Sequence, residues 1–246
     1  MSSEERLVIL SGPSCVGKSP LCSALGKFYP EIDSKLRKLV LVNSRNPLPG
    51  EVDGVDYHFR TREQVEALRA DSRYAVLEAR SDLQALNVEE LKLSLENGDV
   101  LFEGNPYVGR ALQTHPQLNE VKKLSVFVSP LSREEVEYLK GRKVSLPEFV
   151  ADVQRRKLLR RTTYQKHILS ARDLEEIEVR CGAAYREMRE ACRFDHVIVN
   201  HDGEDSEHWD AFYYPVGDAR KTLESFAALL RGEAPAGVEK WEEGLV

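Results

Sequence analysis

The sequence predicts an α/β fold in which a parallel sheet is flanked by helices. Short apolar runs typical of buried strands alternate along the chain with segments of helical spacing, which is the pattern of a sheet covered on both faces. The chain has 246 residues, 41% of them apolar and 31% charged, as in a globular domain with room for an extra lobe. Its net charge of −6 disfavours a general nucleic-acid binder.

The elements of the first hundred residues follow from these patterns. An apolar run predicts a buried strand over residues 6–10, and a helix is expected over 19–28. A second apolar run predicts a strand over 39–42, whereas residues 43–59 are rich in Pro, Gly, Asn and Asp and are expected to be mostly loop. Helical spacing and a glycine stop predict two further helices. The remaining elements expected in this half are helices over 62–70 and 87–98 and strands over 74–78 and 99–103.

The second half of the chain is expected to contain two strands, with a long helical region between them. Strands are expected over 124–128 and 196–199, since both are short apolar runs. Between them, residues 131–193 have a mainly helical and heavily charged pattern. An amphipathic helix is expected over 218–231, and residues 233–246 are expected to form a loose tail.

Several classes of protein are disfavoured by the sequence. No run approaches the roughly 18 apolar residues of a membrane span, and the N-terminus lacks the pattern of a signal peptide, so a cytoplasmic location is expected. The six histidines are scattered and no CxxC pair occurs, which disfavours a metal site built from these residues. The cysteines, expected to be free thiols, are Cys15, Cys22, Cys181 and Cys192.

The stretch GPSCVGKSP at residues 12–20 has the order G-x-x-x-x-G-K-S between an expected strand and an expected helix. Its glycines let successive N–H groups point at an anion. Lys18 would reach the β- and γ-phosphates of ATP, and the Ser19 hydroxyl would ligate Mg²⁺. A purely structural turn is the competing interpretation. The residues expected to bind ATP are Gly12, Pro13, Ser14, Cys15, Val16, Gly17, Lys18, Ser19 and Pro20.

A second segment follows at a characteristic distance. SRNPLPGEVDGVDYHF at 44–59 resembles the T-R-x-P-R-x-G-E-x-x-G-x-D-Y-x-F pattern with which guanylate kinases bind a nucleoside monophosphate. The resemblance continues through VLE (76–78), GDVLFEGN (98–105), LSVFVSP (124–130) and FDHVIVN (194–200). It implies a P-loop kinase domain over 1–232. In that domain the core is about 6–42, 98–130 and 194–231, an acceptor-binding insertion covers 43–97, and a helical lid covers 131–193.

The resemblance also implies roles for particular residues. Arg45 matches an arginine that grips the acceptor phosphate, Tyr57 a tyrosine that hydrogen-bonds it, and Glu78 a glutamate that reads the guanine edge. Glu103 and Asn105 stand where the family has two aspartates, and asparagine offers a donor as well as an acceptor. Loop packing and solvated surface charges remain the alternative roles of Arg45, Tyr57 and Glu78. Further departures from the family are Leu41, Leu48 and the stretch 82–88.

A strongly basic stretch, residues 153–167, falls where nucleoside monophosphate kinases carry their lid. Arg156 and Arg160 are four residues apart and so share one helix face. With Lys18, these two arginines are the expected catalytic residues, because phosphoryl transfer requires positive charge on the transferred group. A solvated basic face and an RNA-contacting helix are the alternatives.

The expected function is ATP-dependent phosphoryl transfer to a nucleoside monophosphate, with GMP or dGMP favoured. A kinase for another phosphorylated acceptor and a non-catalytic binding module are the alternatives. The retained Lys18 and Ser19 favour the enzyme, since non-catalytic relatives generally lack an intact triphosphate loop. Nucleotides are the expected partners, with no nucleic acid and no membrane, and a homodimer stays open. The aromatic cluster is expected to serve packing, with a small lobe, a subunit contact or part of a base pocket as alternatives. Its members are Trp209, Phe212, Tyr213 and Tyr214.

Overall fold

The computed structural model describes residues 5–47, 51–80 and 82–246, so the departure expected at Leu48 lies outside the described residues. The chain divides into two compact units. Unit 1 comprises the residues up to Ile9 together with Lys35–Ser125, and unit 2 comprises Leu10–Ser34 and Val126–Val246. Two strands, β1 (Arg6–Ser11) and β8 (Lys122–Ser129), belong partly to each unit.

In unit 2, β9 (His196–Val199) lies between β8 and β10 (Val238–Glu239). β9 pairs with β8 in parallel, with Val126 opposite His196, and β10 pairs with β9 in the antiparallel direction. The expected strands 6–10, 124–128 and 196–199 are therefore present. Their apolar runs are explained by complete burial, since residues 7–10 of β1 are 0% exposed.

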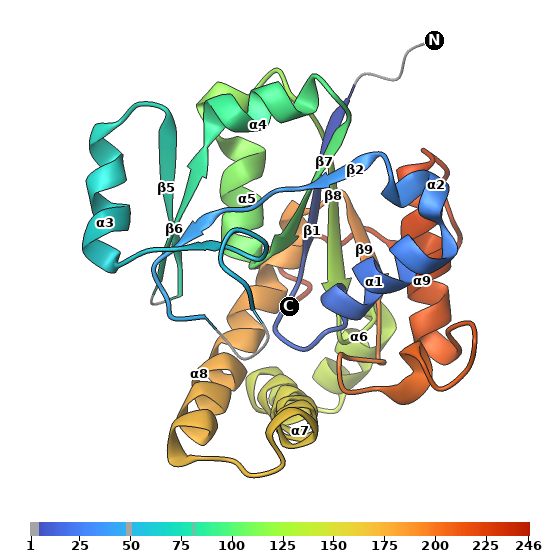
Figure 1. Cartoon of the computed structure of the whole chain (residues 1–246). Helices are drawn as coiled ribbons and strands as arrows, with labels where there is room; N and C mark the ends of the chain where they lie inside the picture. Colours follow the sequence, from blue (N-terminus) through green and yellow to red (C-terminus); the bar gives the residue numbers. More distant parts are fainter. Residues whose placement is uncertain (1–4, 48–50, 81) are drawn as a thin grey trace. The chain divides into compact units, whose positions relative to one another are not determined.

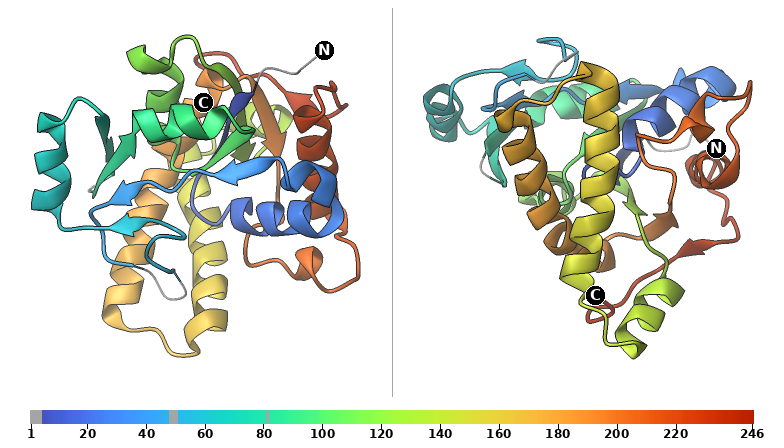
Figure 2. Two further views of the ribbon diagram at one scale, coloured as in Figure 1. Left: turned by 45° about the horizontal axis from the view of Figure 1, so that its top comes forward. Right: turned by 90° about the horizontal axis from the view of Figure 1, so that it is seen from below.

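The helices of unit 2 include a long hairpin. α7 and α8 lie side by side, yellow and orange in Figures 1 and 2, in the region expected to be a helical lid. Serine caps fix two of the helix starts, because Ser132 and Ser170 each accept from the backbone three residues on in a capping box. The helical elements are α1 (Lys18–Phe28), α2 (Pro30–Asp33), α6 (Arg133–Gly141), α7 (Leu146–Lys166), α8 (Ala171–Met188), η3 (Arg189–Arg193), η4 (Glu207–Trp209) and α9 (Gly217–Leu230).

Unit 1 holds β2 (Leu36–Lys38), which pairs in parallel with β7 (Asp99–Gly104), and a separate four-stranded sheet in the order β4-β3-β6-β5. Helix α3 packs on this second sheet, because Val65 is buried against Leu83 and Ala85. The strands of the second sheet are β3 (Val42–Asn43), β4 (His58–Phe59), β5 (Tyr74–Ala79) and β6 (Asp82–Asn87). The helical elements of unit 1 are α3 (Arg62–Ala67), η1 (Leu68–Ala70), α4 (Val88–Leu95), α5 (Pro106–Thr114) and η2 (Pro116–Leu118).

The predicted α/β fold with a mostly parallel sheet is confirmed, with two local differences. The strand expected over 39–42 is wrong, because β2 ends at Lys38 beside β7 and β3 begins at Val42 beside β6. The apolar run between them connects two sheets: the Leu39 N–H donates to Leu101 O, and Leu41 O accepts from the His58 N–H. Residues 82–87, for which no strand was expected, form β6.

The expectation of a loose C-terminal tail is also wrong. Val238 and Glu239 form β10 against β9, and the Trp241 side chain is only 2% exposed. Buried apolar area of this kind stabilises a terminal segment that composition alone indicates to be loose. Among the described residues, no helix is both long enough and apolar enough to cross a bilayer.

Candidate functional site

The phosphate-loop candidate, residues 12–19, joins the end of β1 to the start of α1. A Cβ on Gly12 would stand 2.4 Å from the backbone oxygen of Val128, so a side chain cannot fit there. Gly17 has φ +96°, and a Cβ on it would stand 2.5 Å from Asn200 Nδ2. Both motif glycines are therefore required by this backbone, because the left-handed conformation and the close approaches exclude side chains.

Lys18 begins α1 and turns back into the loop. Its side chain is buried, and Nζ donates to Gly12 O at 3.1 Å and to Pro13 O at 2.8 Å. Ser19 is exposed in the first turn of the same helix, and that turn contains no acidic residue. A helix N-terminus and a lysine ammonium thus stand together with no carboxylate in the first turn, which suits a polyphosphate anion.

Cys15 links the phosphate loop to the helical hairpin. Its φ is +61°, its side chain is 0% exposed, and it packs with Leu158 of α7 and with Ile177 and Cys181 of α8. Burial, with a contribution from the nearby Glu204 carboxylate, raises the pKa of the Cys15 thiol to about 12. The thiol therefore stays protonated and contributes packing. Through this contact the hairpin of α7 and α8 packs against the loop.

Helix α7 directs cations at the segment that follows β9. The Lys157 ammonium donates to His201 O at 2.8 Å, and burial lowers its pKa. Arg161 forms an ion pair with Glu204, and its side chain is 19% exposed. Lys157 and Arg161 belong to the basic stretch noted in the sequence, but sequence reasoning did not select them as candidates. Their spacing of four residues, with the apolar Leu158 beside Lys157, is the signal that marks this face of the helix as the inner one.

The two arginines predicted from the sequence have more exposed positions on α7. Arg160 pairs with Asp205 at 2.8 Å, although its side chain is 69% exposed. Arg156 is exposed, and its Nε donates to Asp152 O within the same helix. Arg160 and Arg161 therefore both pair with the acidic segment 204–205, whereas Arg156 donates to a carbonyl group of its own helix.

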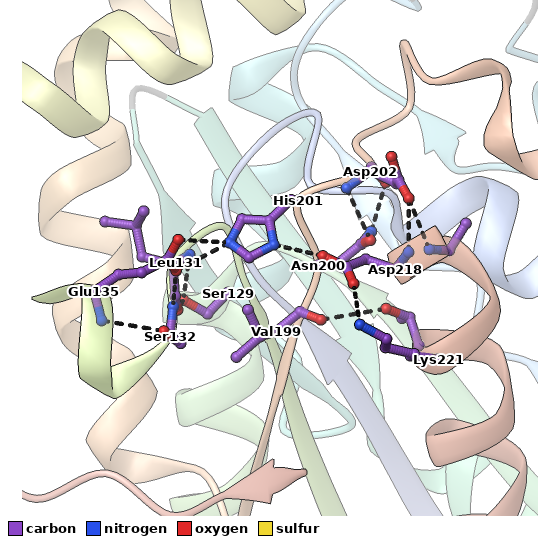
Figure 3. A network of polar contacts seen from close by, with 12 residues as sticks. Ser129, Leu131, Ser132, Glu135, Val199, Asn200, His201, Asp202, Asp218 and Lys221 are labelled. Carbon is purple, nitrogen blue, oxygen red and sulfur yellow. Dashed lines mark hydrogen bonds and ion pairs between the residues drawn. The ribbon is translucent and has the colours of Figure 1, made fainter. Parts of the chain in front are cut away.

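The end of β9 is a polar junction (Figure 3). Asp202 accepts from the backbone N–H groups of Asp218 and Ala219 at 2.9 and 3.0 Å and so caps the start of α9. Figure 3 also shows the His201 ring between Glu135 of α6 and Asp218 of α9, with Nε2 2.9 Å from a Glu135 oxygen. His201 therefore connects two helices through carboxylates on both ring nitrogens.

These partners raise the pKa of His201. Burial alone would lower it, but the hydrogen bonds to Asp218 and Glu135 outweigh burial. Burial would raise the pKa of the Glu135 carboxyl group, but hydrogen bonds from Ser132 and His201 lower it. Burial would likewise raise the pKa of Asp218, but hydrogen bonds from Lys221 and His201 lower it. The contacts therefore favour the charged form of all three groups.

Replacing His201 by glutamine should cost stability in a pH-dependent way. Because the folded pKa of His201 is raised, its stabilisation is fully present below its unfolded pKa of about 6.5 and is lost as pH rises through the folded value. At strongly acidic pH, protonation of Glu135 and Asp218 removes it again. Since the His201 side chain is 47% exposed, a difference below about 1 kcal/mol is expected.

Urea unfolding of the wild type and of His201→Gln at pH 5.5, 7 and 9 measures this effect. The difference in unfolding free energy should be largest at pH 5.5 and smallest at pH 9. An equal difference at all three values would assign His201 to packing alone.

The acceptor-site candidates of unit 1 form a compact cluster. Arg45 binds Glu51 through both guanidinium branches, with Nη1 2.6 Å from Oε2, and its guanidinium carbon lies 5.2 Å from the centroid of the Tyr57 ring. Burial raises the pKa of Tyr57, Arg45 opposes that shift, and the nearby Glu103 adds to it. The structure thus brings Arg45, Tyr57 and Glu103 together.

The other predicted residues of this region have different surroundings. Glu78 is exposed on β5, opposite Leu83. Asn105 caps α5, because its Oδ1 accepts from the Tyr107 N–H at 2.9 Å. Leu41 is 1% exposed in the core, which explains an apolar residue there. In the part of the chain that the structure describes, no group of three or more His, Cys, Asp or Glu side chains is arranged to hold a metal ion.

The mixed α/β fold places Gly12, Gly17 and Lys18 on a loop between a strand and a helix, which is the context that the motif at residues 12–19 requires. The family model for guanylate kinase matches residues 4–156, more than half of the chain. The chain belongs to the guanylate kinase family. It is therefore a nucleotide-binding transferase, a nucleoside monophosphate kinase, and the family predicted from the sequence is confirmed.

Individual relatives agree with this assignment. The chain is 29% identical over 206 residues to the guanylate kinase of Rickettsia bellii, covering 81% of this chain and 88% of the relative. It is 32% identical over 202 residues to the guanylate kinase of Corynebacterium jeikeium, covering 80% of this chain and 89% of the relative. The crystal structure of guanylate kinase from Anaplasma phagocytophilum has the same fold, with a TM-score of 0.57 and 18% sequence identity. The match covers 94% of this chain and 87% of the Anaplasma chain.

Proposed function

We propose that residues 12–19 bind the triphosphate of ATP and that the protein transfers the γ-phosphoryl group to GMP or dGMP. One observation carries the proposal: two glycines that admit no side chain frame a loop whose buried Lys18 ammonium lies on the loop's own backbone oxygens. Family membership supports the same activity, because the relatives bear the name guanylate kinase.

The residues present fit ATP and Mg²⁺. The backbone N–H groups of the loop and the start of α1 would hold the phosphates, and Lys18 would neutralise part of their charge. The exposed hydroxyl of Ser19 would ligate Mg²⁺. The ion would supply positive charge that offsets the negative charge developing during transfer.

The chemical step needs little from the protein beyond position and charge. An oxygen of the acceptor phosphate attacks the γ-phosphorus, the bond to the β,γ-bridging oxygen breaks, and ADP leaves. The attacking oxygen is already ionised, so we infer no general base. We assign charge stabilisation to Lys18 and to the α7 arginines Arg156 and Arg160, and the contacts of Arg161 favour adding it to this group.

The carboxylates of residues 204 and 205 bear on this assignment. Glu204 forms an ion pair with Arg161, and Asp205 forms one with Arg160. A bound phosphate would compete for the same guanidinium groups, since both anions accept bidentate hydrogen bonds from arginine. We therefore propose that these arginines exchange a carboxylate for a phosphate during turnover.

The acceptor would be held by the cluster in unit 1. Arg45 and Tyr57 would bind its phosphate, and Glu78, Glu103 and Asn105 would contact the base. The fork of Arg45 is already ordered by Glu51, which is the geometry that a phosphate requires. A non-catalytic module has no comparable support, because Lys18 and Ser19 are retained in a loop of the correct form.

Glu78→Gln tests the choice of base. The variant should lose roughly tenfold to hundredfold in kcat/KM for GMP, because a carboxylate that accepts two hydrogen bonds becomes an amide that presents one donor. The KM for ATP should not change. Steady-state rates with GMP, dGMP, AMP, CMP and UMP measure the effect, and Glu66→Gln, an exposed glutamate paired with Arg69, is the control.

An equal loss with every acceptor would assign Glu78 to structure. Turnover that is faster with a different phosphorylated acceptor would replace GMP in the proposal. A cytoplasmic location and nucleotides as the partners complete the proposal, with a homodimer left as an alternative to the monomer.

A further inference from the structure

The segment after β9, residues 200–209, packs against the second half of the phosphate loop. Asn200 is fully buried and donates from Nδ2 to Val16 O at 2.8 Å. Gly203 lies so close to the loop that a Cβ on it would stand 2.4 Å from Cys15 O. The backbone of residues 15–17 is therefore supported from one side by this segment.

Trp209 fixes the segment and also touches the loop. Its side chain is 8% exposed, and Nε1 donates to Asp202 O at 3.1 Å and to Gly203 O at 3.0 Å. The indole Cζ2 lies 3.2 Å from the position of a Cβ on Gly17. One indole thus binds two carbonyl groups of the supporting segment and packs on the residue that precedes Lys18.

We propose that Trp209 is a positioning residue for the phosphate loop. It fixes the carbonyl groups of Asp202 and Gly203, and through this segment it holds residues 15–17 in the conformation that binds a nucleoside triphosphate. The inference rests on the proposed function of the loop. It gives a specific role to Trp209, one of the four clustered aromatic residues that the sequence analysis expects to serve packing.

The physical reason is preorganisation. Backbone N–H groups are the main phosphate ligands of such a loop, so its conformation determines which ligands are available. Gly17 has a left-handed conformation without a side chain to restrain it, and it needs support from neighbours. If only a fraction of molecules hold the binding conformation, the apparent affinity for ATP falls by that fraction. Trp209 should therefore affect ATP and leave the acceptor unaffected.

Calorimetric titration with MgATP tests this role in two substitutions. Trp209→Leu removes both the ring packing and the N–H and should weaken ATP binding about tenfold, as the loss of about 1.4 kcal/mol does. Trp209→Phe keeps an aromatic ring without the N–H and should give an intermediate value. The KM for GMP should stay within about twofold of the wild type, because Trp209 acts on the triphosphate loop.

The protein provides a matched control, because it contains two tryptophans. Trp241 is also buried, at 2% exposed, and its Nε1 donates to Glu239 beside β10. Trp241→Phe should bind MgATP like the wild type. It also leaves Trp209 as the sole tryptophan, whose fluorescence should change on MgATP titration with a midpoint equal to the calorimetric Kd.

The possible outcomes separate this inference from the proposed function. Wild-type protein that binds no ATP would overturn both. ATP affinity unchanged in both Trp209 variants, or an equal loss in Trp241→Phe, would overturn the positioning role alone. If Trp209→Leu fails to fold, Trp209→Phe and the single-tryptophan titration still decide, and a Trp209 emission that does not respond to bound ATP contradicts the proposal.

Discussion

Replacing Lys18 by alanine should lower kcat by roughly 10²–10³-fold, the usual effect of removing one preorganised charge-stabilising group from an active site. The Lys18 ammonium is buried on the oxygens of Gly12 and Pro13, at the loop that would hold the triphosphate. Its charge would meet the phosphates in a site where water screens little. A coupled assay of ADP formation with saturating GMP measures the loss.

The fold should survive this substitution, since the Lys18 ammonium hydrogen-bonds to backbone oxygens of the loop itself. Circular dichroism and thermal unfolding check that point. Lys27→Ala is the matched control, because Lys27 is an exposed lysine of the same helix and lies over the Phe28 ring. Activity of the Lys18 variant within threefold of the wild type would remove Lys18 from the mechanism.

Replacing Arg45 by alanine should reduce kcat/KM for GMP by about 10²-fold while the KM for ATP stays unchanged. Loss of one partner of a hydrogen-bonded charge pair costs about 2–5 kcal/mol, and about 2.7 kcal/mol corresponds to a hundredfold. Arg45 is the cation of the unit 1 cluster and is ordered by Glu51 and Tyr57. Initial rates at varied GMP and fixed ATP give the effect.

Two further variants isolate the geometry of the guanidinium. Arg45→Lys keeps the charge but loses the planar fork, so it should recover only part of the activity. Arg69→Ala, an exposed arginine of the same unit paired with Glu66, should behave like the wild type. If the KM of Arg45→Ala rises equally for ATP and GMP, Arg45 supports the fold and does not select the acceptor.

The strand–loop–helix around residues 12–19 could be predicted because its signal is local. Gly12, Gly17 and Lys18 stand at fixed spacings between an apolar run and a helix, and the structure requires the glycines through contacts within a few ångströms. Arg45 and Tyr57 could be placed together for a similar reason, since they lie on one short segment and interact within it. Elements defined by their neighbours in sequence are the ones that a sequence determines best.

The remaining features depend on contacts between distant segments. Two contacts decide which face of α7 points inward: Leu158 packs on Cys15, and Lys157 donates to His201. The charge pattern of the sequence contains neither contact, so it did not separate Arg161 from Arg156. The strand β10 has only two residues and exists because β9 offers a free edge to pair with. Trp209 acquires its contacts from a chain reversal that no periodicity reveals.

The most direct test of the central claim follows the γ-phosphoryl group itself. Purified protein is incubated with γ-labelled ATP, Mg²⁺ and GMP, and the labelled products are separated. The proposed activity predicts label in GDP, with ADP formed in equal amount. Lys18→Ala should transfer the label roughly 10²–10³-fold more slowly than the wild type. Label that stays in ATP with every monophosphate, or that appears only as inorganic phosphate, would contradict it.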